Sequence, residues 1–378
     1  MGTEIKKIGI VTWFESENMG TNLQAYALYE KLVSLGYDVS LISYFNYESW
    51  GLSTQVKNLL EKLGVLDFIR MNFGKAVSRK RKIRIYKFFY KNVKIEKTYS
   101  RKQYIRLLEQ FDIFISGSDQ IWNPNHLDSF YLLDFAANKK KIAYASSIGV
   151  REIPENLKIV YSKYLQSYSQ IGLRETVGVN IVNELLGVKK AIKVVDPTFL
   201  LSSQEWRKLA NLSKLEYKDN FLFCYFIGNR KRYEEYLKDV YLQSGCSKII
   251  VFCSMENSRI RFKSIHNIIY LKDSGMEDFV YLISQAKIVC TDSFHATAIS
   301  INLQKNFVEF LRFNDKDGKS QNSRITDILG RYELTNRIYS PNNIEYLNAI
   351  HYQKKMEVLR HDIEDSVMFL KQAIINGK

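Results

Sequence analysis

Short apolar runs alternate with helix-like stretches along most of this chain, and this alternation limits the folds available to it. The runs have the length and composition of buried strands. They cover residues 8–13, 39–44, 113–116, 142–148, 169–173, 191–194, 221–227, 248–252, 268–271, 287–290 and 307–310. Strands that alternate with helices form parallel sheets covered by helices. Since 378 residues suffice for two cores, we expect an α/β protein of two doubly wound, Rossmann-like domains facing each other across a cleft.

The order of these elements suggests where each domain begins and ends. We expect residues 1–170 to form the first domain, which includes a mostly helical stretch, 52–108. Residues 171–345 should form the second domain. Residues 346–378 have the pattern of a long closing helix that returns to the first domain.

The composition is that of a water-soluble globular protein, with 46% hydrophobic and 25% charged residues. The amino-terminal apolar run is short and meets Glu15 and Glu17, so it predicts a first strand and not a signal peptide. We therefore expect a cytoplasmic protein, with possible peripheral contact at the inner face of the plasma membrane. The four cysteines lack paired spacing and are expected to be reduced thiols.

Positive charge is concentrated in one segment. Between Lys75 and Arg106 there are 13 Lys or Arg and a single acid, Glu96, with aromatic residues interleaved. Three interpretations compete: a solvated helical face, attachment to anionic lipid or a lipid diphosphate, and nucleic-acid binding. Charge alone does not choose among them, although the rest of the chain makes nucleic acid the least favoured partner.

The stretch VCTDSFHATAISI, residues 289–301, combines a strand end, capping residues and a short helix. His295 is expected in the first turn of that helix, where unpaired N–H groups and the helix dipole favour a bound phosphate or carboxylate. In open α/β sheets ligands bind beyond the carboxyl ends of strands. The alternative is that His295 only caps or packs the helix.

Two other loops place polar groups directly after predicted strands. The first contains Asn18 and Gly20, and the second, GSDQIWNP, contains Asp119, Gln120 and Trp122. Polar groups in such loops collect at a crevice, although Asn18, Gly20 and Asp119 could equally be ordinary turn residues. No GxGxxG motif is present, so nothing here indicates a dinucleotide.

Taken together, several stretches resemble the polysaccharide pyruvyl transferase family. They are IGIVTWFESENMGTNLQAYALYEKL, GSDQIWNP, IAYASSIG, LRETVG, VVDPTFLLSSQEW, TDSFHATAISI and SRITDILGRYEL, in this order between residues 8 and 334. The resemblance implies a glycosyltransferase-B-like fold. It also implies transfer of the carbon skeleton of phosphoenolpyruvate onto two hydroxyls of a sugar, which forms a cyclic ketal in bacterial capsular or exopolysaccharide, on a lipid-linked acceptor.

The resemblance also implies roles for residues. His295 and Asp119 would be catalytic, as proton donor or acceptor and as general base. Phosphoenolpyruvate would be bound by a cationic, hydrogen-bonding set, and the acceptor by a polar set in the early loops. The donor set is Arg174, Thr291, Ser293 and Arg324; the acceptor set is Asn18, Gly20, Gln120 and Trp122. The alternative for Arg174 and Arg324 is that either belongs to an ion pair between the domains.

Two positions depart from some relatives, which carry arginine where this chain has Ser293 and glycine where it has Ala296. Another cation must therefore hold the donor. We expect the second domain to bind the donor, because the elements best suited to anions follow residue 170. No metal ion or cofactor is expected, since no spaced His and carboxylate cluster is present.

Two rival functions remain open. Two facing α/β domains also serve nucleotide-sugar glycosyltransferases, although no carboxylate suited to a nucleotide ribose is evident. A non-catalytic carbohydrate-binding or nucleic-acid-binding module is the alternative from another class.

Overall fold

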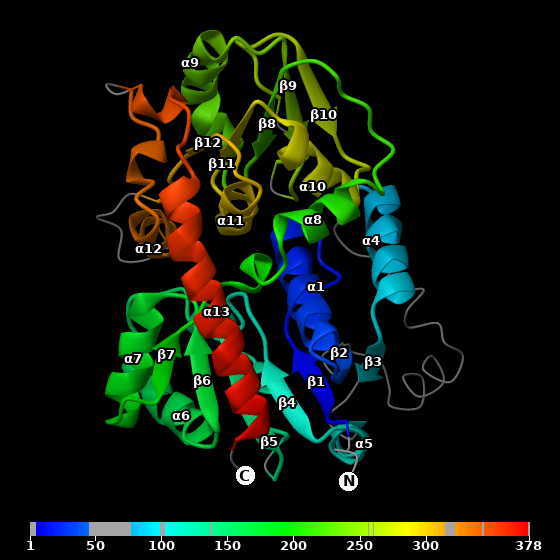
Figure 1. Cartoon of the computed structure of the whole chain (residues 1–378), viewed down its shortest axis with the longest axis vertical. Helices are drawn as coiled ribbons and strands as arrows, with labels where there is room; N and C mark the ends of the chain where they lie inside the picture. The colour runs from blue at the N-terminus through cyan, green and yellow to red at the C-terminus, as the bar shows by residue number, and fades with distance from the viewer. Residues whose placement is uncertain are drawn as a thin grey trace.

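The structure is a computed structural model that describes residues 5–44, 77–98, 103–136, 138–255, 257–259, 261–313, 322–341 and 344–376. Within these residues the chain builds two fully parallel sheets, one of seven strands and one of five. Figure 1 shows the larger sheet in the lower half and the smaller in the upper half. The expected α/β architecture of two doubly wound domains is confirmed.

The larger sheet has the strand order β3-β2-β1-β4-β5-β6-β7. Its strands are β1 (Lys7–Val11), β2 (Asp38–Tyr44), β3 (Ile95–Thr98), β4 (Ile113–Ser116), β5 (Lys140–Ser146), β6 (Gln170–Leu173) and β7 (Ala191–Lys193). The helices between them are α1 (Met19–Ser34), α4 (Arg79–Asn92), α5 (Tyr104–Gln110), α6 (Glu155–Leu165) and α7 (Thr176–Leu186). All four residues of β4 are buried, because helices cover both faces of a parallel sheet.

The smaller sheet has the order β10-β9-β8-β11-β12. Its strands are β8 (Phe221–Tyr225), β9 (Lys248–Phe252), β10 (Ile268–Leu271), β11 (Ile288–Thr291) and β12 (Phe307–Glu309). Its helices are α9 (Glu234–Ser244), α10 (Met276–Gln285), α11 (Phe294–Asn302) and α12 (Ser323–Arg331). A continuous cluster of buried apolar side chains joins the two domains where α1 packs on α10 and α11.

The boundary between the domains lies later than residue 170. Strands β6 and β7 follow that residue, yet β6 pairs with β5 and β7 pairs with β6 in the first sheet. The second sheet begins only at Phe221, and α8 (Ser203–Ala210) connects the two and packs on α10. The alternation of strands and helices does not reveal which sheet a strand joins, so the sequence placed β6 and β7 in the wrong domain.

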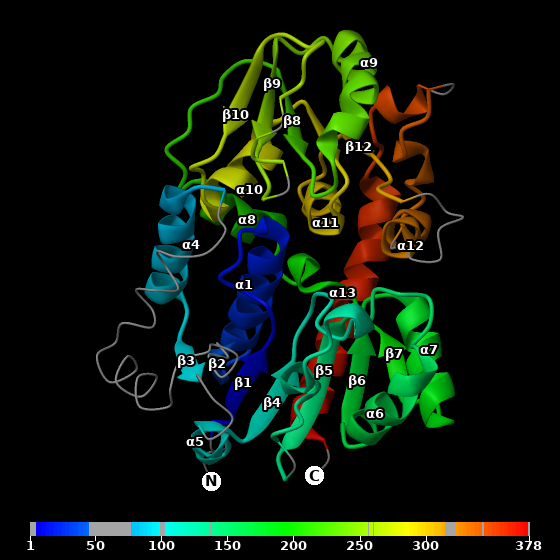
Figure 2. The ribbon, with the colours of Figure 1, turned by 180° about the vertical axis from the view of Figure 1, so that it is seen from behind.

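The last helix, α13 (Gln353–Ile375), starts beside the second domain and crosses to the first (Figures 1 and 2). The Lys140 ammonium donates to the Ile374 carbonyl at 3.0 Å, and the Phe369 and Tyr144 rings lie 6.5 Å apart. The Ser366 hydroxyl also accepts a hydrogen bond from the Val195 N–H at 2.9 Å. The helix therefore bridges the end of the first sheet and the second domain.

The basic segment is only partly helical. Residues 52–76 and 99–102, which belong to the stretch expected to be mostly helical, lie outside the described residues. Helix α4 forms as expected, but Ile95–Thr98 forms the edge strand β3, a run too short to show a period.

Arg81 of α4 is buried and does not belong to a solvated face. Its guanidinium donates to the carbonyls of Ser274 and Leu271, both at 3.0 Å, and to that of Cys253, and it lies over the Phe252 ring. These groups belong to the second domain. Part of the positive charge of α4 therefore ties the two domains together.

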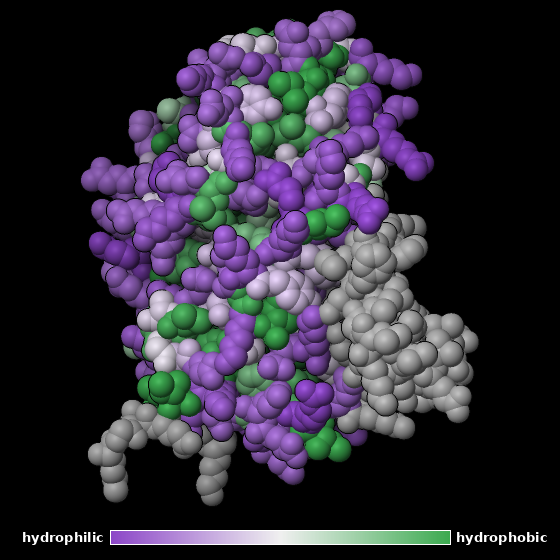
Figure 3. All heavy atoms as spheres, turned by 90° about the vertical axis from the view of Figure 1, so that its right-hand side faces the viewer, coloured by the Kyte–Doolittle hydropathy of each residue, from purple (hydrophilic) through white to green (hydrophobic). Residues whose placement is uncertain are grey.

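One face of the molecule, shown in Figure 3, carries mostly hydrophilic side chains with small, scattered apolar patches. In the described part of the chain, every helix is too short or too polar to cross a membrane. The cysteines are unpaired thiols, and three of them, Cys224, Cys253 and Cys290, are buried.

Candidate active site

The carboxyl ends of the two sheets face each other and enclose a cavity of about 560 Å³. The loops after β1 and β4, with Tyr44 at the end of β2, line it from the first domain, and the start of α11, Arg312 and Arg324 line it from the second. The lining residues are Thr12, Trp13, Phe14, Ser16, Asn18, Thr21, Tyr44, Asp119, Gln120, His126, Tyr131, Ile227, Ser293, Phe294, His295, Arg312 and Arg324.

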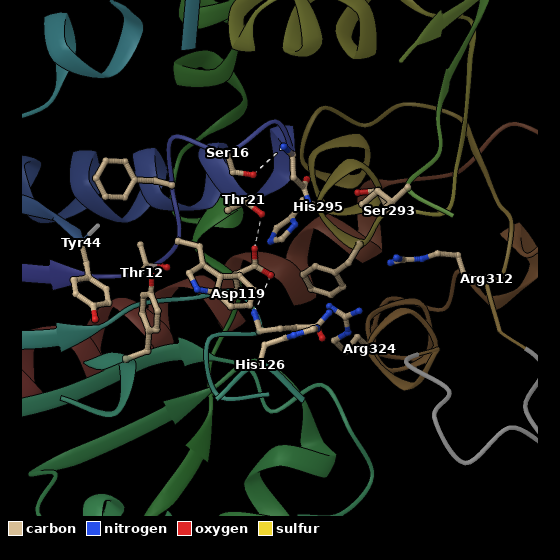
Figure 4. A pocket seen from close by; sticks show the side chains of 17 residues that line it. Thr12, Ser16, Thr21, Tyr44, Asp119, His126, Ser293, His295, Arg312 and Arg324 are labelled. Atoms are coloured by element: carbon tan, nitrogen blue, oxygen red, sulfur yellow. Dashed lines mark hydrogen bonds between the residues drawn. The ribbon is translucent and has the colours of Figure 1, made fainter. Parts of the chain in front are cut away.

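The cavity has two chemically different ends (Figure 4). Tyr44 lies toward one end, Arg312 and Arg324 lie toward the other, and Asp119 and His295 lie between them. A ligand that spans the cavity would therefore meet an aromatic wall, a carboxylate with an imidazole, and a pair of guanidinium groups in turn.

His295 lies in the first turn of α11, as expected. Ser293 is the N-cap of this helix, and its hydroxyl accepts from the Ala296 N–H at 3.5 Å. The imidazole packs against Gly20 in the first turn of α1, where a Cβ would stand 2.6 Å from the Cβ of His295. The positive ends of two helices thus meet at one point, which favours a bound anion.

The Nε2 atom of His295 contacts two groups of the first domain. Arg174 Nη1 lies 3.0 Å from it, and Asp196 Oδ2 lies 3.6 Å from it. A guanidinium only donates hydrogen bonds, so a bond from Arg174 requires an unprotonated Nε2. A protonated Nε2 would instead be attracted by Asp196. Both protonation states of the ring therefore have a partner, as a group that gives and takes protons requires.

Arg174 is buried among three carboxylates. It lies 2.9 Å from Asp196, 3.6 Å from Asp119 and 3.7 Å from Glu175. Burial tends to lower its pKa, but the three carboxylates raise it further, so the pKa of Arg174 stays above its usual value.

The position of Arg174 differs from the predicted role of donor contact. It follows β6 of the first sheet, and it lines a smaller cavity of about 340 Å³ behind Phe294 and not the larger one. Its neighbours at hydrogen-bonding distance are Ser118, Asp196 and His295. Arg174 therefore contacts the imidazole across the domain boundary.

Asp119 lies in the cavity wall in a backbone conformation that is rare outside glycine, with φ of 74°. Its side chain accepts from the Thr21 hydroxyl at 2.6 Å and from the Gln120 N–H at 2.8 Å. Burial raises its pKa, but protonated His295, Arg174 and these two donors lower it by more, so the pKa lies below its usual value. Asp119 is therefore a carboxylate at neutral pH.

The surroundings of Arg324 favour an added anion. It lies in the first turn of α12, at the positive end of the helix. Burial, together with the Arg174 and Arg312 guanidinium groups, lowers the pKa of Arg324 to about 9. Arg312 lies 3.9 Å from Asp292 and lines the same end of the cavity. A phosphate or carboxylate here would offset this accumulation of positive charge.

Asn18 and Gln120 line the cavity, as predicted from the sequence. The Asn18 side chain caps α1 by accepting from the Gly20 N–H at 3.0 Å, and it also accepts from the Tyr225 hydroxyl of the second domain at 3.3 Å. The turn role and a place in the cavity wall are therefore both observed. Gly20 lies beneath His295 and outside the wall.

Two further predicted contacts, besides Arg174 and Gly20, lie outside the cavity. Thr291 is fully buried; its hydroxyl donates to the Tyr225 carbonyl at 2.6 Å and accepts from the Ser293 N–H at 3.1 Å. Trp122 is fully buried too, and its indole N–H donates to the Tyr131 carbonyl at 3.0 Å. Both shape the loops that carry cavity residues.

Sequence reasoning missed several groups of the site. Arg312 follows β12, and Asp196 follows β7, and both positions lie at strand ends where polar groups signal a crevice. The aromatic residues Trp13 and Tyr44 were read as members of predicted strands, so their place at the cavity was not anticipated.

A comparison with known protein families finds a match over most of the chain. Residues 18–311 match the family described as polysaccharide pyruvyl transferase. No curated protein matches the chain.

Solved structures show the fold. The MnaA–UDP structure from S. aureus is 9% identical, with a TM-score of 0.50, and the match covers 96% of this chain and 91% of that one. MurG from Acinetobacter baumannii is 12% identical, with a TM-score of 0.42 and coverage of 97% and 95%. The likeness to the MnaA–UDP structure agrees with a fold of two facing α/β domains, and the family match covers most of the chain. The chain belongs to the polysaccharide pyruvyl transferase family.

Proposed function

We propose that the protein transfers the carbon skeleton of phosphoenolpyruvate to two hydroxyls of a sugar and forms a cyclic pyruvate ketal. The observation that carries the proposal is the cationic end of the cavity, where Arg312 and Arg324 lie beside the amino terminus of α11. Phosphoenolpyruvate brings a carboxylate and a phosphate, and guanidinium groups with a helix N-terminus suit both.

The reaction balances as follows. The methylene carbon gains a proton as the C=C π bond breaks, the central carbon gains two bonds to sugar oxygens, and its bond to the phosphate oxygen breaks. Of the two hydroxyl protons released, one balances the proton consumed at the methylene carbon and the other leaves with phosphate. The scheme uses no metal ion or cofactor.

His295 is our candidate for the group that protonates the methylene carbon. Its Nε2 atom lies between Arg174 and Asp196, so the ring has a partner with and without the proton. Asp119 is the candidate acceptor for a sugar hydroxyl. Because its pKa lies below the usual value, its main contribution is to orient that hydroxyl as a hydrogen-bonded anion.

The departure at Ser293 fits this scheme. Ser293 caps α11 where some relatives have arginine, and Arg312 and Arg324 line the same cavity. These two residues supply the cations that the donor requires. We propose that the donor lies at this end, against the second domain, and that the acceptor enters from the first.

A lipid-linked acceptor in a bacterial capsular or exopolysaccharide pathway would bring the protein to the inner face of the plasma membrane. The exposed lysines of α4, Lys80, Lys87 and Lys91, would then face anionic lipid. Changing these three to Ser should weaken binding to vesicles of anionic lipid, whereas the same change at exposed Lys208, Lys214 and Lys371 should not. If both variants lose vesicle binding to the same extent, the binding comes from the overall positive charge of the protein and not from α4.

The main test is the reaction itself. Purified protein, phosphoenolpyruvate and a set of galactosides, glucosides and mannosaminides should release phosphate in proportion to ketal formed. His295→Gln and Arg324→Gln should lose this activity while keeping the folded far-UV spectrum. Sugar transfer from a nucleotide sugar, without any release of phosphate from phosphoenolpyruvate, would favour the glycosyltransferase alternative.

A further inference from the structure

The aromatic end of the cavity is built from three neighbouring strands of the first sheet. Tyr44 is the last residue of β2, Trp13 follows β1 by two residues, and Tyr131 lies in the loop after β4. Strands β2, β1 and β4 are adjacent and parallel, so their carboxyl ends bring the three rings to one edge of the sheet.

The three rings form a corner. Trp13 and Tyr131 have centroids 6.0 Å apart with ring planes at 85°, and Tyr44 and Tyr131 have centroids 6.4 Å apart at 74°. All three line the cavity and keep part of their surface exposed. Neighbouring walls of the corner thus meet at steep angles.

Buried groups hold the corner in place. Tyr44 stacks on the fully buried Phe130 with centroids 4.1 Å apart. The carbonyl of Tyr131 accepts hydrogen bonds from the Trp122 indole at 3.0 Å and from the Ser116 hydroxyl at 2.6 Å. A corner fixed before the ligand arrives loses little entropy on binding.

We propose that Trp13, Tyr44 and Tyr131 form a subsite for the pyranose ring of the acceptor, whose reacting diol points toward Asp119 and His295. A pyranose has apolar C–H groups that pack on aromatic rings and hydroxyls around its rim that need polar partners. Gln120, His126 and Asp119 line the same cavity and can bind those hydroxyls. This proposal rests on the proposed function, and it specifies that the acceptor is a pyranose and where its ring binds.

The corner favours a saturated ring over a nucleobase. A flat base gains most from parallel aromatic faces, whereas two rings at 85° give it one face at most. A chair-shaped pyranose is thick and presents C–H groups in more than one direction, so it can contact both walls.

The test measures the binding of methyl glycosides in the absence of donor, by saturation-transfer NMR and titration. Trp13→Ala and Tyr131→Ala should weaken glycoside binding by roughly tenfold, the loss expected when an aromatic contact is removed. Tyr131→Phe should bind nearly as well as the wild type, because it keeps the ring. Tyr236→Ala, which removes a partly exposed aromatic of the second domain that stacks on Tyr339 at 4.6 Å, is the matched control.

The outcomes separate the subsite from the proposed function. Retention of phosphoenolpyruvate binding in Trp13→Ala, with loss of glycoside binding, supports the subsite. If the protein binds glycosides through Trp13 but does not bind phosphoenolpyruvate, the subsite is supported and the proposed donor is wrong. Three results would overturn the subsite. The wild type does not bind glycosides, or Trp13→Ala and Tyr131→Ala bind them as tightly as the wild type does. The third is that Trp13 is needed to bind uridine or adenosine monophosphate and not glycosides.

Discussion

The imidazole of His295 packs directly on Gly20, although 275 residues separate them and they belong to different domains. A single methyl group on Gly20 would stand 2.7 Å from Cγ of the ring, closer than side-chain atoms tolerate. The contact joins the amino termini of α1 and α11. The position of the central imidazole therefore depends on the fit between the two domains.

Gly20→Ala should reduce pyruvate transfer by about 100-fold, the cost of displacing a reacting group by about 1 Å. The protein should remain folded, because the clash can be relieved by a small separation of the domains. Gly330→Ala is the control, since a Cβ at that exposed helical glycine meets nothing within 4 Å. Wild-type turnover in Gly20→Ala would show that the contact does not hold His295 in place.

Arg174→Ala should lower the free energy of unfolding by about 3–5 kcal/mol, because it leaves buried carboxylates without their cation. The measurement is chemical denaturation followed by circular dichroism. Arg331→Ala, which removes a partly exposed partner of Asp362, should cost less than about 1 kcal/mol. A stable but inactive Arg174→Ala protein would instead assign Arg174 to the chemistry alone.

Arg324→Gln should abolish the thermal stabilisation that phosphoenolpyruvate gives to the wild type. Without ligand, its melting temperature should equal or exceed that of the wild type, because burial and two neighbouring arginines already disfavour the Arg324 charge. Differential scanning calorimetry with and without donor measures both effects. A donor-induced shift that survives the substitution would place the donor away from Arg324.

Asp119→Asn should change the pH dependence of the unfolding free energy without changing the pH dependence of transfer activity. The pKa of Asp119 is lowered on folding, so its charge stabilises the folded state above the usual value of 3.8, and this stability is lost as pH falls toward the lower folded pKa. The difference in unfolding free energy between wild type and Asp119→Asn should therefore shrink below about pH 4. An acidic limb of transfer activity near pH 6 would belong to another group, and it should persist in any residual activity of Asp119→Asn.

Arg81→Ala should destabilise the junction between α4 and the second domain. It removes the guanidinium donor from three carbonyls of that domain, of which the Leu271 carbonyl keeps the Cys253 N–H as a donor at 2.9 Å. A cost of about 1–3 kcal/mol is expected when a buried hydrogen bond of this kind is lost. Lys80→Ala changes an exposed neighbour on the same helix and should be nearly neutral. Equal denaturation midpoints for the two variants would contradict the docking role of Arg81.

Much of the fold could be read from local patterns. β4, β9 and β10 occupy the residues expected, because an apolar run bounded by turn residues marks a buried strand clearly. Which sheet a strand joins is set by pairing across the chain, and β6 and β7 show that local patterns do not contain this information.

The candidate site shows the same division. The sequence placed His295 at the start of a helix after a strand, and Asp119, Gln120, Ser293 and Arg324 in the site, and all five line one cavity. It could not show that Trp122 and Thr291 point into the core, because the side a loop residue faces depends on neighbours distant in sequence. The pairing of Arg174 with His295 across the domain boundary was hidden for the same reason.

The dependence of His295 on groups from both domains has a consequence for turnover. Arg174 and Gly20 belong to one half of the molecule and the imidazole to the other, so moving the two domains apart would separate His295 from both residues. Under the proposed function, phosphoenolpyruvate bound to such a separated form would have no proton donor held beside it. The contact between the domains would thus limit the reaction of the donor with water when no acceptor is bound, without a dedicated lid.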